Sequence, residues 1–318
     1  MDTLTHHATQ TAVSVMGLRK TYGEKVVLDG VDLTIAEGEV FALLGPNGAG
    51  KTTIVRILST LIQADAGTAT VMGYDLRAEA GAVRRVIGVT GQFSAVDDLL
   101  TGDENLLLMG RLLHLPPTVR RARAAELLRR FDLVEVARQT PATYSGGMRR
   151  RLDIAMTLMG QPRLIFLDEP TTGLDPRSRQ IMWQLIRDQV AAGVTILLTT
   201  QYLEEADQLA NRIAVLDHGR IVAEGTPEDL KRRMPGAHIR LRFADIASLD
   251  KAARELNQGT RDEQNLVLRI PNDGGIRSLR DVLARLGDDV AVEDLSIHTP
   301  DLDDVFFAVT SSASKENS

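Results

Sequence analysis

Four short, mostly apolar runs of residues are spaced along the chain. They are Val40–Leu44, Leu164–Leu167, Val194–Leu198 and Ile213–Leu216. A run that is apolar at consecutive positions, rather than at alternate ones, is typical of a strand buried on both faces of a parallel sheet. Helical patterns lie between several of these runs, so the connections are expected to cross over the sheet. The sequence therefore predicts an α/β fold with a parallel sheet at its core.

Two further regions adjoin this predicted core. Before the first buried strand, Val13–Leu18, Val26–Leu28 and Val31–Ile35 have the pattern of short strands and predict an antiparallel β flap. Between about residues 93 and 160 the apolar positions take a helical spacing. This interval predicts a helical subdomain inserted into the α/β core.

The pattern changes again after about residue 230, where strands and helices become short and mixed. We therefore divide the chain into a first domain, residues 1–230, and a small α+β accessory domain, residues 231–318. The last residues, Ser311–Ser318, are small and polar and are expected to be disordered. The elements predicted in the second domain are strands at His238–Phe243, Leu266–Ile270 and Val290–Ile297 and helices at Leu249–Leu256, Ile276–Leu286 and Leu302–Val309.

Composition narrows the classes of function. The 318 residues include no cysteine, which excludes disulfides, thiolate catalysis and cysteine-ligated metals. A net charge of −6 and a pI of 5.6 argue against a nucleic-acid partner, because such proteins usually carry a basic face. No apolar run approaches the roughly 18 residues that cross a bilayer. We expect a soluble chain, in which any membrane-spanning part belongs to another polypeptide.

The segment Gly45–Thr52 has the sequence of a phosphate-binding loop. It reads G-P-N-G-A-G-K-T, which fits G-x-x-x-x-G-K-[ST], and it lies between the first buried strand and a helical pattern. The glycines let successive backbone N–H groups point at phosphate oxygens, and the helix N-terminus adds attraction for negative charge. Lys51 would reach the β- and γ-phosphates, and the Thr52 hydroxyl would ligate Mg²⁺. This segment predicts binding of a nucleoside triphosphate.

Two acidic residues, Asp168 and Glu169, follow the buried run Leu164–Leu167. A carboxylate at the carboxyl end of a strand faces the crevice in which α/β sheets bind ligands. Asp168 is placed to hold Mg²⁺, directly or through water. Glu169 is placed to orient or deprotonate the water that attacks the γ-phosphate. A second acid beside the metal ligand favours hydrolysis over binding alone.

A second anion site is predicted at Ser145-Gly146-Gly147. These residues precede a helix whose apolar positions include Leu152 and Met156. A serine followed by glycines at a helix start offers backbone N–H groups to an anion, for the same reasons as the phosphate loop. Taken alone, this pattern is also explained by a simple helix cap.

In their order and spacing, these motifs resemble those of ATP-binding-cassette (ABC) ATPases over about residues 11–230. The resemblance implies that Tyr22 stacks on adenine and that Gln92 contacts Mg²⁺ and the attacking water and links to a membrane subunit. Ser145–Met148 resembles the signature sequence, with methionine where glutamine is usual, and Asp175 belongs to the loop that crosses to the partner subunit. With ATP and Mg²⁺ as cofactors, the nucleotide-binding residues implied are Tyr22, Gly45, Pro46, Asn47, Gly48, Ala49, Gly50, Lys51, Thr52, Thr53, Ser145, Gly146, Gly147, Met148 and Asp175.

One position departs from the family pattern. The family usually places a histidine that contacts the γ-phosphate after the strand equivalent to Val194–Leu198, and here that position is Gln201. A glutamine can donate a hydrogen bond to phosphate, but it cannot carry a proton or a charge near neutral pH. We therefore predict that Glu169 is the base and that Gln201 only senses phosphate. The catalytic residues implied are Glu169, Gln201 and Gln92, and the metal-contacting residues are Thr52, Gln92 and Asp168.

The resemblance also implies partners. In the family, the signature of one subunit closes over the nucleotide that another subunit holds, so two copies of this chain are expected to form two equivalent ATP sites. ATP bound only to Gly45–Thr52 would leave its γ-phosphate facing solvent, where transition-state charge is poorly stabilised.

Three segments, Tyr144–Arg151, Thr199–Asp207 and Thr299–Phe306, further resemble the daunorubicin-resistance subfamily. That subfamily implies an ABC-2 type exporter, in which this chain powers efflux of a hydrophobic drug or lipid through a separate integral-membrane permease. The chain would then lie peripherally at the cytoplasmic face of the cell membrane.

Three other functions were weighed, and only the last stays open. Soluble cassette ATPases of translation or antibiotic protection resemble two tandem cassettes, whereas this chain has one. A DNA-repair ATPase would need a long coiled coil between Gly45 and Ser145, and that interval is too short. A nucleotide-dependent switch with little turnover stays open because of Gln201.

Overall fold

The structure is a computed structural model that describes residues 10–91, 95–232, 237–272, 276–286, 290–298 and 301–306. The chain divides into two compact units, Met1–Thr226 and Pro227–Ser318. Within the described ranges, no helix has both the length and the apolar character that crossing a membrane requires. The tail predicted to be disordered, Ser311–Ser318, lies outside these ranges.

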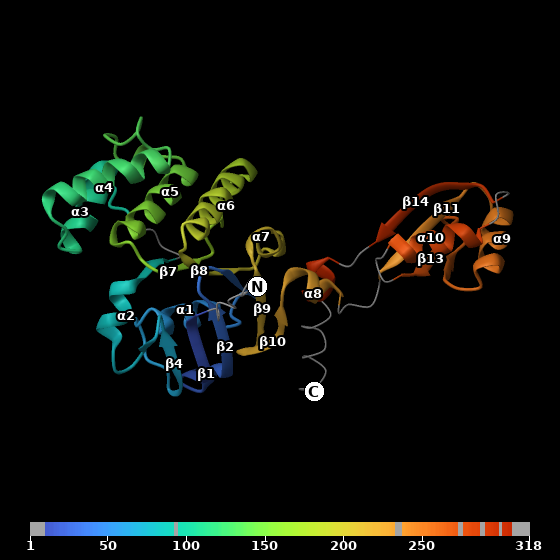
Figure 1. Ribbon diagram of the computed structural model, residues 1–318, viewed down its shortest axis with the longest axis horizontal. Helices are drawn as coiled ribbons and strands as arrows, with labels where there is room; N and C mark the ends of the chain where they lie inside the picture. The colour runs from blue at the N-terminus through green and yellow to red at the C-terminus, as the bar shows by residue number, and fades with distance from the viewer. Residues whose placement is uncertain are drawn as a thin grey trace, which may run out of the picture. The chain divides into compact units, whose positions relative to one another are not determined.

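A six-stranded sheet forms the centre of the first unit (Figure 1). Its strands are β3 (Val40–Leu44), β6 (Ile87–Thr90), β7 (Leu164–Asp168), β8 (Thr195–Thr200), β9 (Arg212–Asp217) and β10 (Arg220–Gly225). Their order is β10-β9-β3-β8-β7-β6, and all pairs are parallel except β9 with β10. Every residue of β3, β7 and β8 is buried, as the consecutive apolar positions predicted. The α/β class is therefore confirmed.

The flap is a second, antiparallel sheet of order β2-β1-β4-β5. Its strands are β1 (Thr11–Tyr22), β2 (Lys25–Ala36), β4 (Ala66–Val71) and β5 (Tyr74–Asp75). The two short strands predicted around Gly30 are one continuous strand, β2. Leu18 pairs with Val31 and Arg19 with Asp29, so Gly30 is an extra residue in the ladder, with a φ of 78°. The glycine thus marks a β-bulge rather than a turn.

One apolar core joins the flap to the central sheet. It contains alternate residues of the sheet strands, such as Phe41 and Leu43 of β3, together with Ile54 and Ile57 of helix α1 (Lys51–Leu58). Each of these side chains is fully buried, and burial of one such side chain contributes about 1.5–3 kcal/mol. The packing of β3 and α1 in this core fixes the position of the phosphate loop between them.

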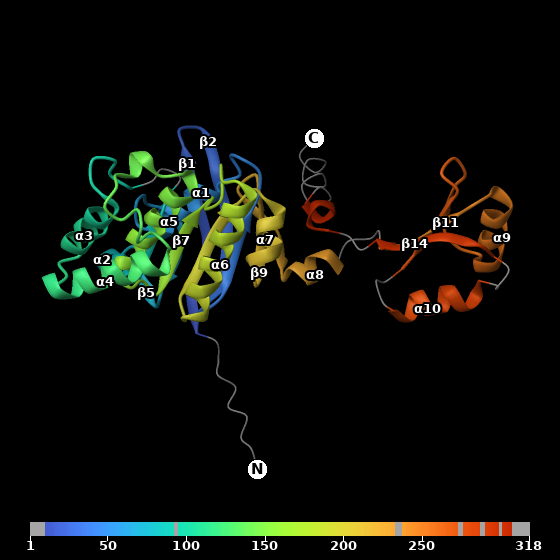
Figure 2. The same cartoon turned by 90° about the horizontal axis from the view of Figure 1, so that it is seen from above.

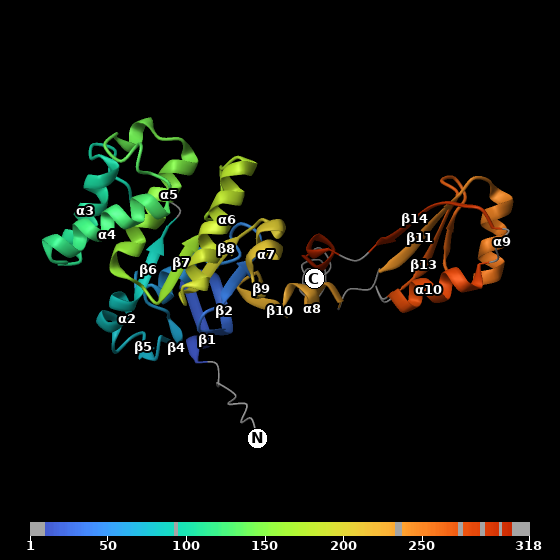
Figure 3. The same cartoon turned by 45° about the horizontal axis from the view of Figure 1, so that its top comes forward.

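Three helices, α3 (Gly102–Leu112), α4 (Pro117–Arg130) and α5 (Gly146–Thr157), pack on one another. They form a group apart from the flap strands (Figures 1 and 3). Thr101 begins α3 with a capping box, in which it exchanges hydrogen bonds with Glu104. The other helical segments of this unit are α2 (Ala80–Val86), α6 (Pro176–Ala191), α7 (Leu203–Leu209) and the 3₁₀ turns η1 (Pro141–Thr143) and η2 (Leu158–Gly160).

The second unit has a β-α-β-β-α-β order. After α8 (Pro227–Arg232) come β11 (His238–Phe243), α9 (Ile246–Leu256), β12 (Thr260–Asp262), β13 (Val267–Pro271), α10 (Ile276–Arg285) and β14 (Val292–His298). The antiparallel sheet has the order β12-β13-β11-β14, which is that of a ferredoxin-like fold. Its core joins the sheet to α9 and α10, and Figure 2 shows α10 beside the sheet. Residues 302–306 of the last predicted helix are helical, and 307–309 lie outside the described residues.

Candidate functional site

The phosphate loop connects β3 to α1, and two of its positions require glycine. A Cβ atom at Gly45 would lie 2.2 Å from the carbonyl oxygen of Leu216. Gly50, the N-cap of α1, has a backbone φ of 112°, which residues with a Cβ atom rarely adopt. The Gly45 N–H donates to the Thr200 carbonyl at 3.4 Å, which ties the loop to β8. The loop is therefore held close to the sheet, with the N-terminus of α1 facing its open side.

Lys51, the first residue of α1, is a buried cation. Its side chain is 5% exposed, and Nζ donates to the carbonyl oxygens of Gly45 at 2.6 Å and Pro46 at 3.1 Å. Nζ also lies 4.0 Å from Oε1 of Glu169. Burial lowers the pKa of Lys51, while the charges of Glu169 and Asp168 act against that shift. A phosphate over the loop would offer Nζ stronger, charge-assisted contacts than these carbonyls do.

Asp168 ends β7 and has a donor set that fits Mg²⁺. The residue is 3% exposed, and its Oδ1 accepts hydrogen bonds from the hydroxyls of Thr52, at 3.3 Å, and of Thr199. Mg²⁺ is usually held by one or two carboxylates with substrate phosphates and waters, so a carboxylate beside the Thr52 hydroxyl suits it. Sequence reasoning missed Thr199, which faces Asp168 in the β7–β8 register.

Glu169 directly follows β7 in an unusual backbone conformation. Its φ is 47°, which is uncommon for a residue with a side chain and is often found at functional sites. Its N–H donates to the carbonyl oxygen of Thr199 at 3.1 Å, and its Oε2 accepts from the Thr172 hydroxyl at 3.2 Å. The backbone and one carboxylate oxygen are therefore fixed, and the other oxygen faces Lys51.

The cavity beside Lys51 has a volume of about 350 Å³. Two of its lining residues, Lys25 and Val27 of β2, were not predicted, although they follow Tyr22 closely in the sequence. Tyr22 does not line this cavity; it faces Lys25 across the β1–β2 hairpin and is 46% exposed. The other lining residues are Asn47, Gly48, Gly50, Lys51, Thr52, Thr53 and Glu169.

Ser145 lies at a different hollow. It caps α5, and its hydroxyl accepts from the Met148 N–H at 3.2 Å. With Gly147 and Met148 it lines a hollow of about 30 Å³ that does not include Lys51. Gly146 lines a third hollow, of about 220 Å³, which Glu169 shares. Within one chain, Ser145 and Lys51 thus line separate spaces.

Asp175 and Gln201 do not line the Lys51 cavity. Asp175 caps α6 by accepting from the Ser178 N–H at 3.0 Å and from its hydroxyl at 2.7 Å, and the latter bond lowers the pKa of Asp175. Gln201 directly follows β8 and is half-buried. Gln92 lies outside the described residues.

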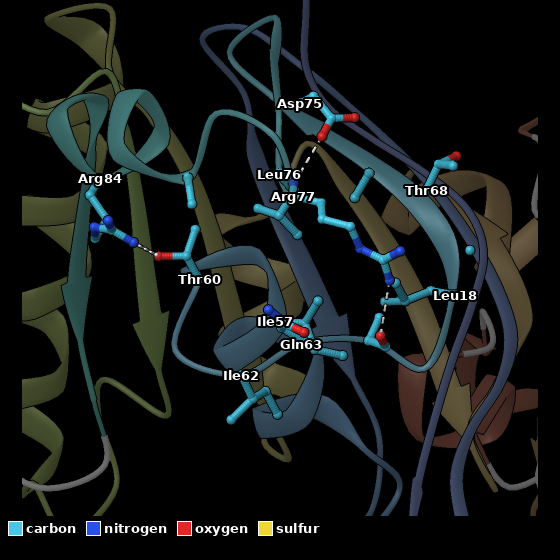
Figure 4. Close-up of a pocket in the computed structure, with 14 residues that line it drawn as sticks. Leu18, Ile57, Thr60, Ile62, Gln63, Thr68, Asp75, Leu76, Arg77 and Arg84 are labelled. Atoms are coloured by element: carbon cyan, nitrogen blue, oxygen red, sulfur yellow. Dashed lines mark hydrogen bonds between the residues drawn. The ribbon is translucent and has the colours of Figure 1, made fainter.

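Another hollow, of about 310 Å³, lies between the flap and helices α1 and α2 (Figure 4). Its two guanidinium groups already have protein partners: Arg77 donates to the Ala64 carbonyl at 3.4 Å and Arg84 to the Thr60 hydroxyl at 3.1 Å. None of the site residues predicted from the sequence lines this hollow. The candidate site is therefore the cavity of Lys51 and Glu169.

Glu205 of α7 has a buried carboxyl group beside Thr171 and Trp183. It is 1% exposed, and its Oε1 accepts from the Thr171 hydroxyl at 2.8 Å and from Nε1 of Trp183 at 3.3 Å. Burial raises the pKa of Glu205 above its ordinary 4.5. An acid with a raised folded-state pKa takes up a proton on folding, so its contribution to stability falls as the pH rises through that range.

We expect the Glu205→Gln variant to melt at a higher temperature than the wild type near neutral pH. Glutamine keeps an oxygen for Thr171 and Trp183 but carries no charge to bury. The difference should shrink toward about pH 4, where Glu205 is protonated in both states. Melting curves between about pH 4 and pH 8 test this; a gain of 1 kcal/mol corresponds to roughly 2–4 °C for a domain of the size of the first unit. A variant that melts lower at every pH would contradict it.

Comparisons with known proteins agree with this geometry. Residues 28–172 match the ABC transporter family. The chain is 48% identical to a daunorubicin resistance ATP-binding protein of Streptomyces coeruleorubidus, over 94% of this chain and 95% of the relative. It is 49% identical to a doxorubicin resistance ATP-binding protein of Mycobacterium tuberculosis, over 94% and 93%. A solved ATP-binding cassette, dimeric in a post-hydrolysis state with ADP and Pi, is 30% identical with a TM-score of 0.61, over 67% of this chain and 98% of that one.

Proposed function

Because the chain belongs to the ABC transporter family of ATP-binding subunits, we propose that it binds ATP with Mg²⁺ at Lys51 and hydrolyses it to power export through a separate permease. The enzyme class is that of the family, an ATPase. The observation that carries the site assignment is that Lys51, Thr52, Asp168 and Glu169 lie close together at the carboxyl ends of β3 and β7.

Each of these residues has a role in hydrolysis. Lys51 and the N-terminus of α1 would hold the β- and γ-phosphates, and Thr52 and Asp168 would hold Mg²⁺, which would neutralise charge on the phosphates. Glu169 orients the attacking water and accepts its proton as the bond from the γ-phosphorus to the bridging oxygen breaks. The hydrogen bond from Thr172 and the constrained backbone of Glu169 support this role, because they fix the direction of its carboxylate.

A second copy of the chain completes the ATP site. Ser145 and Lys51 line separate hollows within one chain, so a phosphate at Lys51 needs a Ser145 from elsewhere. The N-terminus of α5, capped by Ser145, would supply N–H groups to the exposed γ-phosphate. A similar cassette was solved as a dimer with ADP and Pi, which supports assembly of two copies. In this two-copy site, the roles that the family resemblance implies are kept for Tyr22, Gln92, Asp175 and Gln201.

The exported substrate is a hydrophobic drug or lipid. The two relatives named for daunorubicin and doxorubicin resistance match 94% of this chain, including the second unit. Their names, those of drug-resistance ATP-binding proteins, support drug efflux as the function. The ABC-2 type of the permease and the peripheral position of this chain at the cytoplasmic face of the membrane rest on the family resemblance. A second candidate, an ATP-dependent switch with little turnover, is favoured by Gln201 alone, because glutamine replaces the charged histidine of the family.

ATP-driven transport tests this function directly. Inside-out vesicles would be prepared from cells that produce the chain together with a candidate permease, a multi-span membrane protein sought among the neighbouring reading frames. We expect ATP-dependent uptake of daunorubicin, and none with the Lys51→Ala variant. Absence of ATP hydrolysis by the wild type would overturn the enzyme role in favour of the switch. Hydrolysis without uptake of daunorubicin or of a labelled lipid would contradict the exporter role.

A further inference from the structure

Arg150 and Asp153 form a buried ion pair on one face of α5, which the nucleotide-site motifs do not include. Arg150 Nη1 lies 3.2 Å from Oδ2 of Asp153, and the side chains are 13% and 3% exposed. Burial lowers the pKa of Arg150 and raises that of Asp153, and the attraction between the two charges acts against both shifts. Such a pair is costly to bury unless its remaining donors and acceptors are satisfied. Its other partners therefore indicate its role.

The pair also forms hydrogen bonds with Gly91 and Ala95, two residues of the connection from β6 to α3. Arg150 Nη1 donates to the carbonyl oxygen of Gly91 at 3.0 Å, and Oδ1 of Asp153 accepts from the Ala95 N–H at 3.2 Å. Gly91 directly follows β6, so these two hydrogen bonds fix where the chain leaves the sheet and where it continues toward α3. Helix α5 thus contacts this connection at two points, Gly91 and Ala95.

The same arginine also donates hydrogen bonds to the residues that precede and follow Glu169. Arg150 Nη2 donates to the carbonyl oxygen of Asp168 at 3.0 Å, and Nε donates to that of Pro170 at 3.1 Å. These are the carbonyls of the residues before and after Glu169. A left-handed conformation such as that of Glu169 persists only where its surroundings impose it. The planar guanidinium fork suits several fixed carbonyls at once, which a single ammonium group does not.

We propose that Arg150 and Asp153 are positioning residues, a clasp by which α5 fixes Glu169, together with Gly91 and Ala95, in place for hydrolysis. The clasp rests on the proposed function of Glu169 as the base. It does not touch the phosphate-loop cavity, whose lining includes neither residue. Loss of the clasp should therefore lower the rate of hydrolysis while ATP affinity is retained, because a small misplacement of a reacting group is enough to slow the chemical step.

The test compares Arg150→Met with Arg123→Met in the full-length chain. Arg123 is a matched control: it is a partly buried arginine on α4 whose guanidinium donates to the carbonyls of Leu158 and Met159 in η2, directly after α5. Both variants lose hydrogen bonds to backbone carbonyls, but only Arg150→Met releases Glu169. We expect kcat to fall about 10²-fold in Arg150→Met, with the Kd for ATP close to that of the wild type. Arg123→Met should keep kcat within about threefold of the wild type.

Arg150→Lys covers the case in which Arg150→Met does not fold, because lysine keeps the charge beside Asp153. Its single ammonium group cannot serve every carbonyl, so kcat should still fall, by about tenfold, at an unchanged Kd. Turnover by both Arg150 variants within about threefold of the wild type would overturn the clasp. So would an equal loss in Arg123→Met, which would reduce Arg150 to a general support of α5. Failure of the wild type to hydrolyse ATP would instead overturn the proposed function itself.

Discussion

The Glu169→Gln variant is expected to lose ATP turnover by about 10²–10⁴-fold while it still binds ATP. Glutamine has nearly the same shape and keeps an oxygen for the Thr172 hydroxyl, so the fold and the cavity should persist. What it lacks is the capacity to accept a proton from water. The Glu169 carboxylate also stabilises the charged form of Lys51. The neutral amide does not attract Lys51, so the lysine remains available to bind phosphate.

Phosphate release at saturating ATP measures this effect, with ATP binding measured separately by calorimetry. Glu204→Gln is the matched control, since Glu204 is a 69% exposed glutamate at the start of α7 whose nearest cation is Arg179, at 3.9 Å. Its turnover should equal that of the wild type. Normal turnover in Glu169→Gln would remove Glu169 from the role of base, and loss of ATP binding would assign it to the binding site instead.

The Ser145→Asp variant is expected to lose the ATP-driven dimer and, with it, nearly all turnover. Aspartate is as good an N-cap as serine, so α5 should form normally. Its negative charge, however, would meet the γ-phosphate held by a second copy, and like charges at close range repel. Loss of one such stabilising contact costs about 10²–10³-fold in rate, and repulsion adds to that loss. Ser145→Asn keeps the cap without the charge and should retain much more activity. Equal activity of the Asp and Asn variants would contradict contact between Ser145 and phosphate.

The sequence predicted the buried strands well, because a strand with both faces covered needs consecutive apolar residues, as in Val40–Leu44. It failed at Gly30, since a glycine in a β-bulge and a glycine in a turn leave the same local signal. It also missed β6, where Ile87–Thr90 is short and contains a glycine. The strand order of the second unit depends on long-range pairing, which local patterns do not specify.

For the site, the sequence identified residues whose chemistry is local to a motif. Lys51 and Asp168 are examples, because a loop between strand and helix, or the end of a strand, places them without knowledge of the rest of the fold. Thr199 and Lys25 were missed because their roles come from neighbours in a sheet register. Arg150 was missed because its partners, Gly91 just after β6 and Asp168 at the end of β7, are far from α5 in sequence.

The most direct test of the two-copy ATP site is the molar mass of the Glu169→Gln variant in solution with ATP and Mg²⁺, measured by sedimentation. Because this variant hydrolyses ATP slowly, the ATP-bound dimer should accumulate. We therefore predict a molar mass of twice the 34.7 kDa of one chain. The same variant carrying Ser145→Asp should bind ATP and stay at the mass of one chain. A Glu169→Gln protein that binds ATP yet remains a single chain would contradict the account.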